Sequence, residues 1–345
     1  MHTDAIVIGA GQSGLAAAHA LQTRGIRPLI LEAGDTPTGS WPHYYDSLTL
    51  FSPARYSSLP GMPFPGDPNR YPHRDEVVSY LAAYASRLDA DIRTNHRVTR
   101  VTADNGTFTV EAAGKSFTTT TIIAATGGFS RPHRPDLPGL TDYTGTVLHA
   151  AEYRNPAPFA GQRVIVVGAG NSALQIAVEL AQHADVTLAT RAPIRYATQR
   201  PLGRDIHFWS AVLGIDHLPI GHLLRTKPAV PVIDHGPYRA AVTAGHPDRR
   251  AVFTSINDTK VTWPDGTTEH IDTILLATGY RPGLDYLTNL NAFDNAGNPL
   301  QHKGISTTHN GLGYVGLEWQ RSLASATIRG VGRDARYVVR RLQTP

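Results

Sequence analysis

Two glycine-rich turns carry the residues whose types and spacing best predict chemistry in this chain of 345 residues. The first turn, residues 9–14, reads Gly-Ala-Gly-Gln-Ser-Gly and follows a short apolar run at residues 5–8. A buried strand, a tight glycine turn and a helix in this order form a dinucleotide fingerprint. Its glycines let the backbone turn sharply and approach a pyrophosphate, which the N-terminus of the helix then holds. The turn therefore predicts a nucleotide site.

The residue that ends the next strand indicates which nucleotide each turn prefers. After the first turn this residue is Glu32, whose carboxylate can accept both hydroxyls of an adenosine ribose. The second turn begins at Gly168, and the interval that separates Gly9 from Glu32 leads there to Arg191. A guanidinium binds a 2′-phosphate in bidentate geometry, whereas a carboxylate repels it. We therefore predict FAD at the first turn and NADPH, in preference to NADH, at the second.

The same succession of elements occurs twice along the chain. Each half reads as strand, glycine turn, helix and strand, then a β-hairpin, then Ala-Thr-Gly ending at Gly127 or Gly279. This duplication predicts an α/β fold with two Rossmann-like dinucleotide-binding domains, the NADPH domain being inserted into the FAD domain as in glutathione and thioredoxin reductases. The expected domains are FAD-binding residues 1–155, NADPH-binding residues 156–278 and FAD-binding residues 279–345.

Three segments between these elements are less regular. Residues 34–72 are rich in Pro and Gly, and a segment of this length in a compact domain is usually functional. Apolar spacing predicts a helix at residues 74–88 and a continuous strand at residues 116–125. Residues 192–249 read as a helical, partly apolar insertion, which either caps a substrate pocket or completes the core of the second domain.

Composition excludes several classes of protein. The chain has no cysteine, so disulfides and dithiol redox centres are absent, and a cytoplasmic location is expected. No apolar run is long enough for a membrane span, no secretion signal is recognised, and the 16 histidines show no metal-binding spacing. The arginines near the C-terminus predict a solvated helix face, not a nucleic-acid site. We thus expect no metal, no nucleic acid and no membrane partner.

A third motif lies between the two fingerprints and reads Tyr143-x-Gly145-x-x-x-His149-x-x-x-Tyr153. With Tyr143 in place of Phe, it resembles the identifying pattern of class B flavin-dependent monooxygenases, in particular the small bacterial flavin-containing monooxygenases. The resemblance covers nearly the whole chain, and the Gly-Ser-Trp that ends at Trp41 agrees with it. It implies that His149 and Tyr153 couple domain movement to catalysis; we do not expect His149 to be a catalytic base.

The resemblance also implies an activity. NADPH would reduce FAD, O₂ would add to the reduced ring, and a C4a-(hydro)peroxyflavin would pass one oxygen to a soft nucleophile such as a sulfide or amine. Baeyer–Villiger oxidation of ketones by the same flavin peroxide stays an alternative. The expected partners are a small-molecule substrate and O₂, and since dimers are common for this scaffold a homodimer is also considered.

Phe51 is the main departure from the family pattern. Many members carry an asparagine near the reactive carbon of the flavin, at the position that Phe51 occupies here. A phenyl ring excludes water but donates no hydrogen bond, and ordinary core packing is the other explanation for it. An NADPH oxidase or reductase that releases H₂O₂ therefore stays open, as does a non-enzymatic FAD- and NADPH-binding redox sensor.

The fingerprints and the resemblance together assign individual contacts. Phe51, His149 and Tyr153 are the candidates at or near the reaction centre. The expected FAD contacts are Gly9, Gly11, Gln12, Ser13, Gly14, Glu32, Ala33, Ser40, Trp41, Val98, Gly279, Gln320 and Leu323. The expected NADPH contacts are Gly168, Gly170, Asn171, Ser172 and Arg191.

Overall fold

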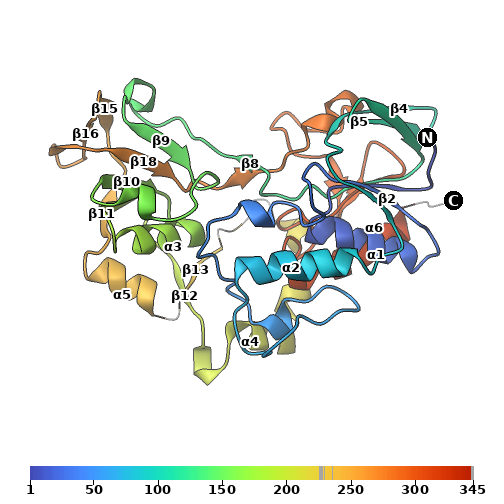
Figure 1. The fold of residues 1–345 in the computed structure, drawn as a ribbon, viewed down its shortest axis with the longest axis horizontal. Helices are drawn as coiled ribbons and strands as arrows, with labels where there is room; N and C mark the ends of the chain where they lie inside the picture. Colours follow the sequence, from blue (N-terminus) through green and yellow to red (C-terminus); the bar gives the residue numbers. More distant parts are fainter. Residues whose placement is uncertain (225–227, 229, 235, 343–345) are drawn as a thin grey trace.

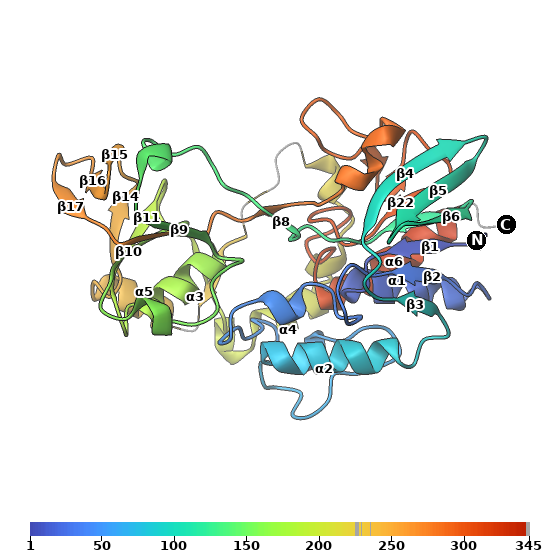
Figure 2. The same ribbon diagram turned by 45° about the horizontal axis from the view of Figure 1, so that its top comes forward.

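Two lobes, each built around a largely or wholly parallel sheet, make up the chain (Figure 1). The computed structural model describes residues 1–224, 228, 230–234 and 236–342. Figure 2 shows the two lobes side by side, with β8 (Arg131–Pro132) on the connection between them. This strand pairs antiparallel with β19 (Tyr280–Arg281), so the outgoing and returning chains cross between the lobes as a short ribbon.

A seven-stranded sheet forms the first lobe. β1, the apolar run ahead of the first glycine turn, lies near its centre and pairs in parallel with β2 and β7. All three strands are fully buried, which explains their uninterrupted apolar sequences. In sheet order the strands are β20 (Gln301–His302), β21 (Ile305–Ser306), β22 (Leu312–Tyr314), β7 (Ile122–Ala124), β1 (Ile6–Ile8), β2 (Leu29–Leu31) and β3 (Asp91–Arg93).

The two faces of this sheet have different covers. Val7, Ile30 and Ile123 point into a core shared with three helices. Ile6 and Leu29 point to the opposite face, where they pack with the antiparallel sheet β4–β5–β6 and with η8 (Asp285–Leu290). The three helices are α1 (Gln12–Gln22), α2 (Arg74–Ala85) and α6 (Ile328–Arg341). The first glycine turn therefore leaves a rigid strand and enters a helix that is buried along most of its length.

A five-stranded parallel sheet forms the second lobe. Its strands, in order, are β14 (Asp248–Ala251), β11 (Asp185–Thr190), β10 (Arg163–Val167), β18 (Thr273–Leu276) and β9 (Thr146–His149). Helix α3 (Asn171–Leu180) packs against β10 and β11. The strand β9 belongs to this sheet because it pairs in parallel with β18. We expected residues 146–149 to belong to the first domain, which was predicted to extend to residue 155. Because β9 is part of the second sheet, the second lobe begins before residue 155.

Each lobe also carries a three-stranded antiparallel sheet, which contains the β-hairpin that the duplication predicts and one further strand. The predicted strand at residues 116–125 is in fact two strands, because Thr119 Oγ1 accepts the backbone N–H of Thr121 and turns the chain from β6 into β7. In the first lobe the strands are β4 (Val98–Asp104), β5 (Thr107–Ala112) and β6 (Lys115–Thr119). In the second lobe they are β15 (Ser255–Asn257), β16 (Lys260–Thr262) and β17 (Thr268–His270).

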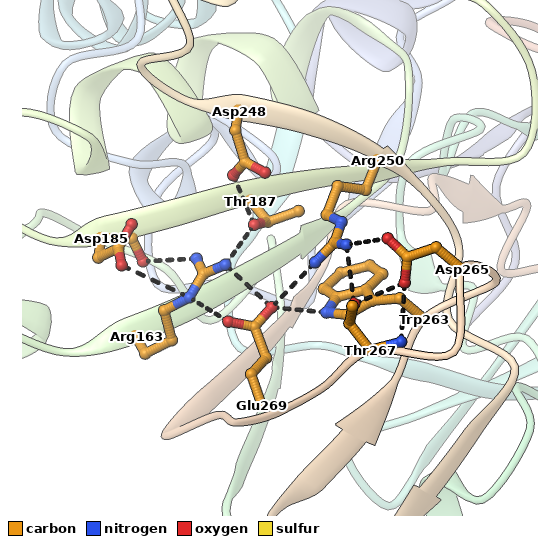
Figure 3. A network of polar contacts seen from close by, with 9 residues as sticks. All are labelled: Arg163, Asp185, Thr187, Asp248, Arg250, Trp263, Asp265, Thr267 and Glu269. Atoms are coloured by element: carbon orange, nitrogen blue, oxygen red, sulfur yellow. Dashed lines mark hydrogen bonds and ion pairs between the residues drawn. The ribbon is translucent and has the colours of Figure 1, made fainter.

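A charged network holds the second antiparallel sheet against the five-stranded sheet (Figure 3). Arg163 on β10 lies 2.9 Å from Glu269 on β17, and its guanidinium also donates to Thr187 on β11. The indole of Trp263 donates to the other oxygen of Glu269, and Arg250 on β14 lies over the indole ring. The carboxylate of Glu269 and the guanidinium groups of Arg163 and Arg250 thus have partners within the protein. The network therefore has a structural role, because it connects the two sheets.

The insertion between β11 and β14 contacts both lobes. Within the insertion, β12 pairs with β13 beside the second sheet. Its helix α4 lies with the first lobe, below α2 in the view of Figure 1. Its tip is tied to the first lobe where Gly221 N donates to Arg321 O at 2.8 Å. Its elements are β12 (Tyr196–Thr198), η5 (Pro201–Gly203), α4 (Ile206–Val212), η6 (Ile215–His217), η7 (Gly221–Leu223), β13 (Val232–Asp234) and α5 (Pro237–Thr243).

The remaining short helices lie in connecting segments. They are η1 (Trp41–His43), η2 (Ala54–Tyr56), η3 (Leu140–Asp142) and η4 (Ala157–Phe159). The irregular segment at residues 34–72 contains the first two of them. No helix in the described part of the chain has the length and apolar character needed to cross a membrane.

Candidate functional site: two glycine turns at the ends of parallel strands

The first glycine turn needs glycine for steric reasons. Gly9 has φ +100°, a conformation that disfavours a side chain, and its N–H donates to Leu31 O at 2.8 Å. A Cβ on Gly14 would lie 1.8 Å from Gly9 O, so only glycine lets α1 pack this closely on β1. These two glycines fix the direction in which α1 leaves the sheet.

The N-terminus of α1 fits a pyrophosphate. Its N-cap is Gly11, no side chain caps the helix, and no acidic residue lies in the first turn. The first N–H groups of the helix therefore lack the partners that a capping side chain would supply. A Cβ on Gly11 would meet only Gly39 Cα, at 3.6 Å, so the backbone here is open to close approach. Free N–H donors and the positive end of a helix suit an anionic ligand.

Glu32 is buried beside this turn and shapes it. Its Oε2 accepts the N–H of Ala10 at 2.5 Å, and its Oε1 accepts the N–H of Gly34 at 2.7 Å. The carboxylate therefore joins the glycine turn to the loop that follows β2. Each carboxylate oxygen has a second lone pair, so Glu32 can accept ribose hydroxyls while it holds the turn. The sequence predicted the contact of Glu32 with the ribose, but it did not predict that Glu32 also holds the glycine turn.

The chain that returns from the second lobe closes on the same turn. A Cβ on Gly316 would lie 2.0 Å from Ser13 Oγ, so residue 316 packs directly against the fingerprint. Trp41 Nε1 donates to Gln12 Oε1 at 2.9 Å, and Gln12 in turn donates to Ala326 O at 3.4 Å. Three distant segments thus meet at the N-terminus of α1, and the predicted FAD contacts Gln12, Ser13 and Trp41 lie there.

Other predicted FAD contacts make structural contacts or lie in other parts of the fold. Gln320 is buried and braces the returning segment, because its Nε2 donates to Tyr314 O at 2.7 Å and its Oε1 accepts the N–H of Leu317. Gly279 lies on the crossing ribbon, and Val98 begins β4 and packs against the core of the first lobe. Ala33 and Leu323 are half-buried, and Ser40 is exposed.

The second glycine turn repeats this geometry in the other lobe. A Cβ on Gly168 would lie 2.4 Å from Ala277 O, so this position also requires glycine. Gly170 is the N-cap of α3, which has no capping side chain and no acidic residue in its first turn. A Cβ on Gly170 would meet nothing within 4 Å. Asn171 Oδ1 accepts the N–H of Ile233, and Ser172 is half-buried at the same helix start.

Arg191 follows β11 directly and is exposed. Among the described residues its guanidinium has no ion-pair or hydrogen-bond partner, so its charge is available at the end of the strand where a 2′-phosphate is expected. Arg249 on β14 is a second cation near this end, because its Nε donates to Thr190 Oγ1 at 3.0 Å. Sequence reasoning missed Arg249, because the pairing of β14 with β11 is not local in sequence.

His149, the last residue of β9, holds the chain that returns from the second lobe. Its Nδ1 accepts the N–H of Ala151 at 3.1 Å, so its Nε2 carries the proton that is donated to Gly279 O at 3.0 Å. Burial, the largest influence, lowers the pKa of His149, although the bond to Gly279 opposes this shift. The ring also packs edge-on against Tyr280. A neutral imidazole with both nitrogens engaged is a positioning group and has no lone pair left for base catalysis.

Tyr153 connects the same motif to α3. Its hydroxyl donates to Glu179 Oε2 at 2.7 Å, and its fully buried ring packs against Tyr45. The adjoining Arg154 contributes a backbone carbonyl that accepts the N–H of Asp46. His149 and Tyr153 therefore link the crossing ribbon, helix α3 and the irregular segment of the first lobe, which is the arrangement that a coupling role needs.

Phe51 lies where the insertion meets the first lobe. Its ring stacks on His207 with centroids 6.1 Å apart, and its carbonyl accepts from Gln199 Nε2. His207 Nδ1 lies 2.7 Å from Asp205, and Tyr71 also donates to this carboxylate. Burial by itself raises the pKa of Asp205, but hydrogen bonds from His207, Tyr71 and Gln199 outweigh it and lower the pKa to about 2.

Through the cluster of Phe51, Asp205 and His207 the α4 part of the insertion packs on the first lobe, whereas Val232 of β13 belongs to the core of the second lobe, so the insertion also completes that core. The sequence offered no signal for this cluster, because Tyr71, Gln199 and His207 lie on separate elements. In the described part of the chain, no group of three or more His, Asp or Glu side chains is arranged to hold a metal ion.

Comparisons with known proteins agree with the two-lobed fold. The model of the pyridine nucleotide-disulphide oxidoreductase family matches residues 6–206. An uncharacterized oxidoreductase CzcO-like of Geobacillus kaustophilus is 32% identical over 339 residues, which cover 97% of each chain. Indole-3-pyruvate monooxygenase YUCCA1 of Oryza sativa is 30% identical and covers 96% of this chain and 90% of its own. A flavin-containing monooxygenase from Stenotrophomonas maltophilia matches with a TM-score of 0.86 at 32% identity, covering 99% of this chain and 98% of its own.

Proposed function

This chain belongs to the pyridine nucleotide-disulphide oxidoreductase family, among its flavin-containing monooxygenases, and from this premise we propose that it is an FAD- and NADPH-dependent monooxygenase. Its substrate is a small molecule with a soft nucleophilic atom, a sulfide or an amine. The observation that carries the proposal is the pair of uncapped helix N-termini in separate lobes, one beside Glu32 and the other beside Arg191. One turn is suited to a ribose diol and the other to a 2′-phosphate.

Each lobe has its own part in this proposal. The N-terminus of α1 and Glu32 hold FAD, and the N-terminus of α3 and Arg191 hold NADPH. FAD supplies the electron transfer and the oxygen activation. The Phe51 ring, stacked on His207, excludes water from the reaction centre. His149 holds the returning chain at Gly279, and Tyr153 connects α3 to Tyr45 of the irregular segment, so both residues couple the lobes. A cytoplasmic location and a homodimer belong to the same proposal.

A carbonyl substrate is the second candidate. Its support is the similarity over nearly the whole chain to a protein named as an indole-3-pyruvate monooxygenase, whose substrate is a 2-oxo acid. Baeyer–Villiger oxidation of a simple ketone belongs to the same class. The two candidates differ in the atom that is oxygenated, so a direct comparison of substrates separates them.

The test is a single reaction series on purified, flavin-loaded protein in air-saturated buffer. We expect NADPH oxidation with a thioether to give one sulfoxide per NADPH and little H₂O₂. Turnover of a ketone or of a 2-oxo acid in place of the thioether identifies the second candidate. Stoichiometric H₂O₂ with every substrate identifies an oxidase, and a flavin that NADPH does not bleach identifies a redox-sensing binder; either result contradicts a monooxygenase.

Arg191 should set the preference between the two nicotinamide cofactors. We expect Arg191→Ala to raise the KM for NADPH about tenfold or more and to leave the KM for NADH nearly unchanged, because a charge-assisted contact to the 2′-phosphate contributes roughly 1.5–3 kcal/mol. Steady-state kinetics with both cofactors measure this. The matched control is Arg97→Ala, which removes another exposed arginine. Equal losses for NADPH and NADH would remove the 2′-phosphate contact from the proposal.

A further inference from the structure

A second concave site lies in the first lobe, on the surface of α6. A cavity of about 580 Å³ opens there beside η6, the part of the insertion that docks on this lobe. It is lined by His217, Arg321, Ser322, Arg333, Asp334, Arg336, Tyr337, Arg340 and Arg341. Five of these side chains are arginines, and one is acidic. The predicted solvated face of this helix therefore borders a cavity of strongly positive charge.

The arginines of α6 differ in whether they have partners. Arg333, Arg336 and Arg340 are exposed, and none of them has an ion-pair partner in the described part of the chain. Arg329 on the same helix is instead half-buried and forms a bidentate pair with the buried Asp216 of η6. The ion pair between Arg329 and Asp216 holds η6 against α6 beside the cavity. The three exposed guanidinium groups stay available to bind a ligand. Seven residues separate Arg333 from Arg340, which places the outer charges roughly 10 Å apart along the helix axis.

Two further guanidinium groups are held in place at the base of the cavity. The side chains of Arg321 and Arg341 lie over the ring of Tyr337, at 3.9 and 4.6 Å from its centroid. Arg321 also donates to Asp334 Oδ1 at 2.9 Å. Stacked guanidinium groups lose little conformational entropy when they bind an anion. The base of the cavity is therefore preorganised.

A buried donor without a partner points to a ligand. Arg321 Nε is buried and has no hydrogen-bond acceptor among the described residues, whereas the Asp334 carboxylate, in a residue that is 2% exposed, is bonded by Arg321 and Ser325. Both residues line the cavity. A buried donor that has lost water and gained no partner carries a free-energy cost, which a bound acceptor would remove. The ligand should thus offer acceptor oxygens to Arg321.

We propose that this cavity binds a ligand that carries at least two phosphate groups. Guanidinium groups match phosphate oxygens in bidentate geometry, and their spread along α6 exceeds the size of one phosphate. The cavity is lined by α6, by η6 and by Arg321 and Ser322 of the returning segment, and neither glycine turn contributes a residue to its lining. A soluble polyphosphate and the headgroups of an anionic lipid surface share this chemistry.

Titration calorimetry of the flavin-loaded protein with sodium tripolyphosphate tests the proposal. The test variant is Arg336→Gln/Arg340→Gln, and the matched control is Arg87→Gln/Arg97→Gln, which removes the same charge from exposed arginines elsewhere. We expect the test pair to weaken binding tenfold or more and the control pair to leave it nearly unchanged. We also expect affinity to fall as salt increases. Melting temperature is recorded for every variant, and because both pairs are exposed we expect no change.

A second arm separates the two sources of phosphate. Co-sedimentation with vesicles of phosphatidylglycerol, against vesicles of phosphatidylcholine, measures binding to a lipid surface. Binding to tripolyphosphate alone assigns a soluble ligand, and arginine-dependent binding to the anionic vesicles assigns a headgroup; both support a phosphate site. Equal affinity of all variants would place the probe at another site, and wild-type protein that binds neither probe would overturn the proposal outright.

Discussion

Glu32→Gln is expected to give a protein that is purified with little or no flavin. The native carboxylate accepts two backbone N–H groups at once, those of Ala10 and Gly34, and it is almost fully buried. A glutamine amide offers one oxygen and one NH₂, so one of these N–H groups would face another donor. Losing a charge-assisted hydrogen bond costs roughly 1.5–3 kcal/mol, and the ribose contact would be lost as well. We therefore expect FAD affinity to fall at least a hundredfold.

Flavin absorbance per protein and titration of the apoprotein with FAD measure this effect. The temperature of the thermal unfolding transition should fall even without flavin, because the hydrogen bonds that Glu32 accepts from the backbone exist in the protein itself. Glu111→Gln is the matched control, since Glu111 is a carboxylate at the protein surface that pairs with Arg100. We expect the control to bind flavin normally. A Glu32→Gln protein with wild-type flavin content would show that the adenosine ribose lies elsewhere.

The elements around each nucleotide turn could be predicted because their causes are local. β1 and residues 164–167 of β10 are short apolar runs that are followed by glycine, and each glycine is required by a contact within its own βαβ unit or with the neighbouring strand. The opposite charges of Glu32 and Arg191 could be predicted for the same reason, since each residue directly follows the strand that comes after the helix of its βαβ unit. Fold and nucleotide turns thus depend on patterns that span about thirty residues.

The parts that escaped prediction depend on contacts between distant segments. β9 is too short to reveal which sheet it joins, and only its pairing with β18 decides this. The amide of Gln320 looked free for a ligand, but the fold turns it back onto Tyr314. The cluster of Phe51, His207 and Asp205 assembles across both lobes, which sequence spacing cannot encode. This cluster around Phe51 was therefore less predictable than the two glycine turns.

Gly170→Ala should abolish productive NADPH binding while the protein stays folded and keeps its flavin. Gly170 has φ −94° and ψ −176°, which alanine adopts without strain, and an added Cβ meets nothing within 4 Å. The change at the N-cap of α3 costs about 1 kcal/mol of stability at most. The new methyl group, however, would occupy the space through which a pyrophosphate approaches the N–H groups of α3. We expect the Kd for NADPH to rise at least a hundredfold, equivalent to roughly 2.7 kcal/mol.

The mirror variant Gly11→Ala provides the sharpest comparison. Its added Cβ would contact only Gly39 Cα at 3.6 Å, so the first lobe should fold, yet the approach to α1 would be blocked in the same way. Gly11→Ala should lose FAD and still bind NADPH, whereas Gly170→Ala should keep FAD and lose NADPH. Flavin absorbance and NADPH titration on both proteins read the two sites independently. If both variants lost the same cofactor, or if Gly170→Ala bound NADPH with wild-type affinity, the assignment of one nucleotide to each lobe would be wrong.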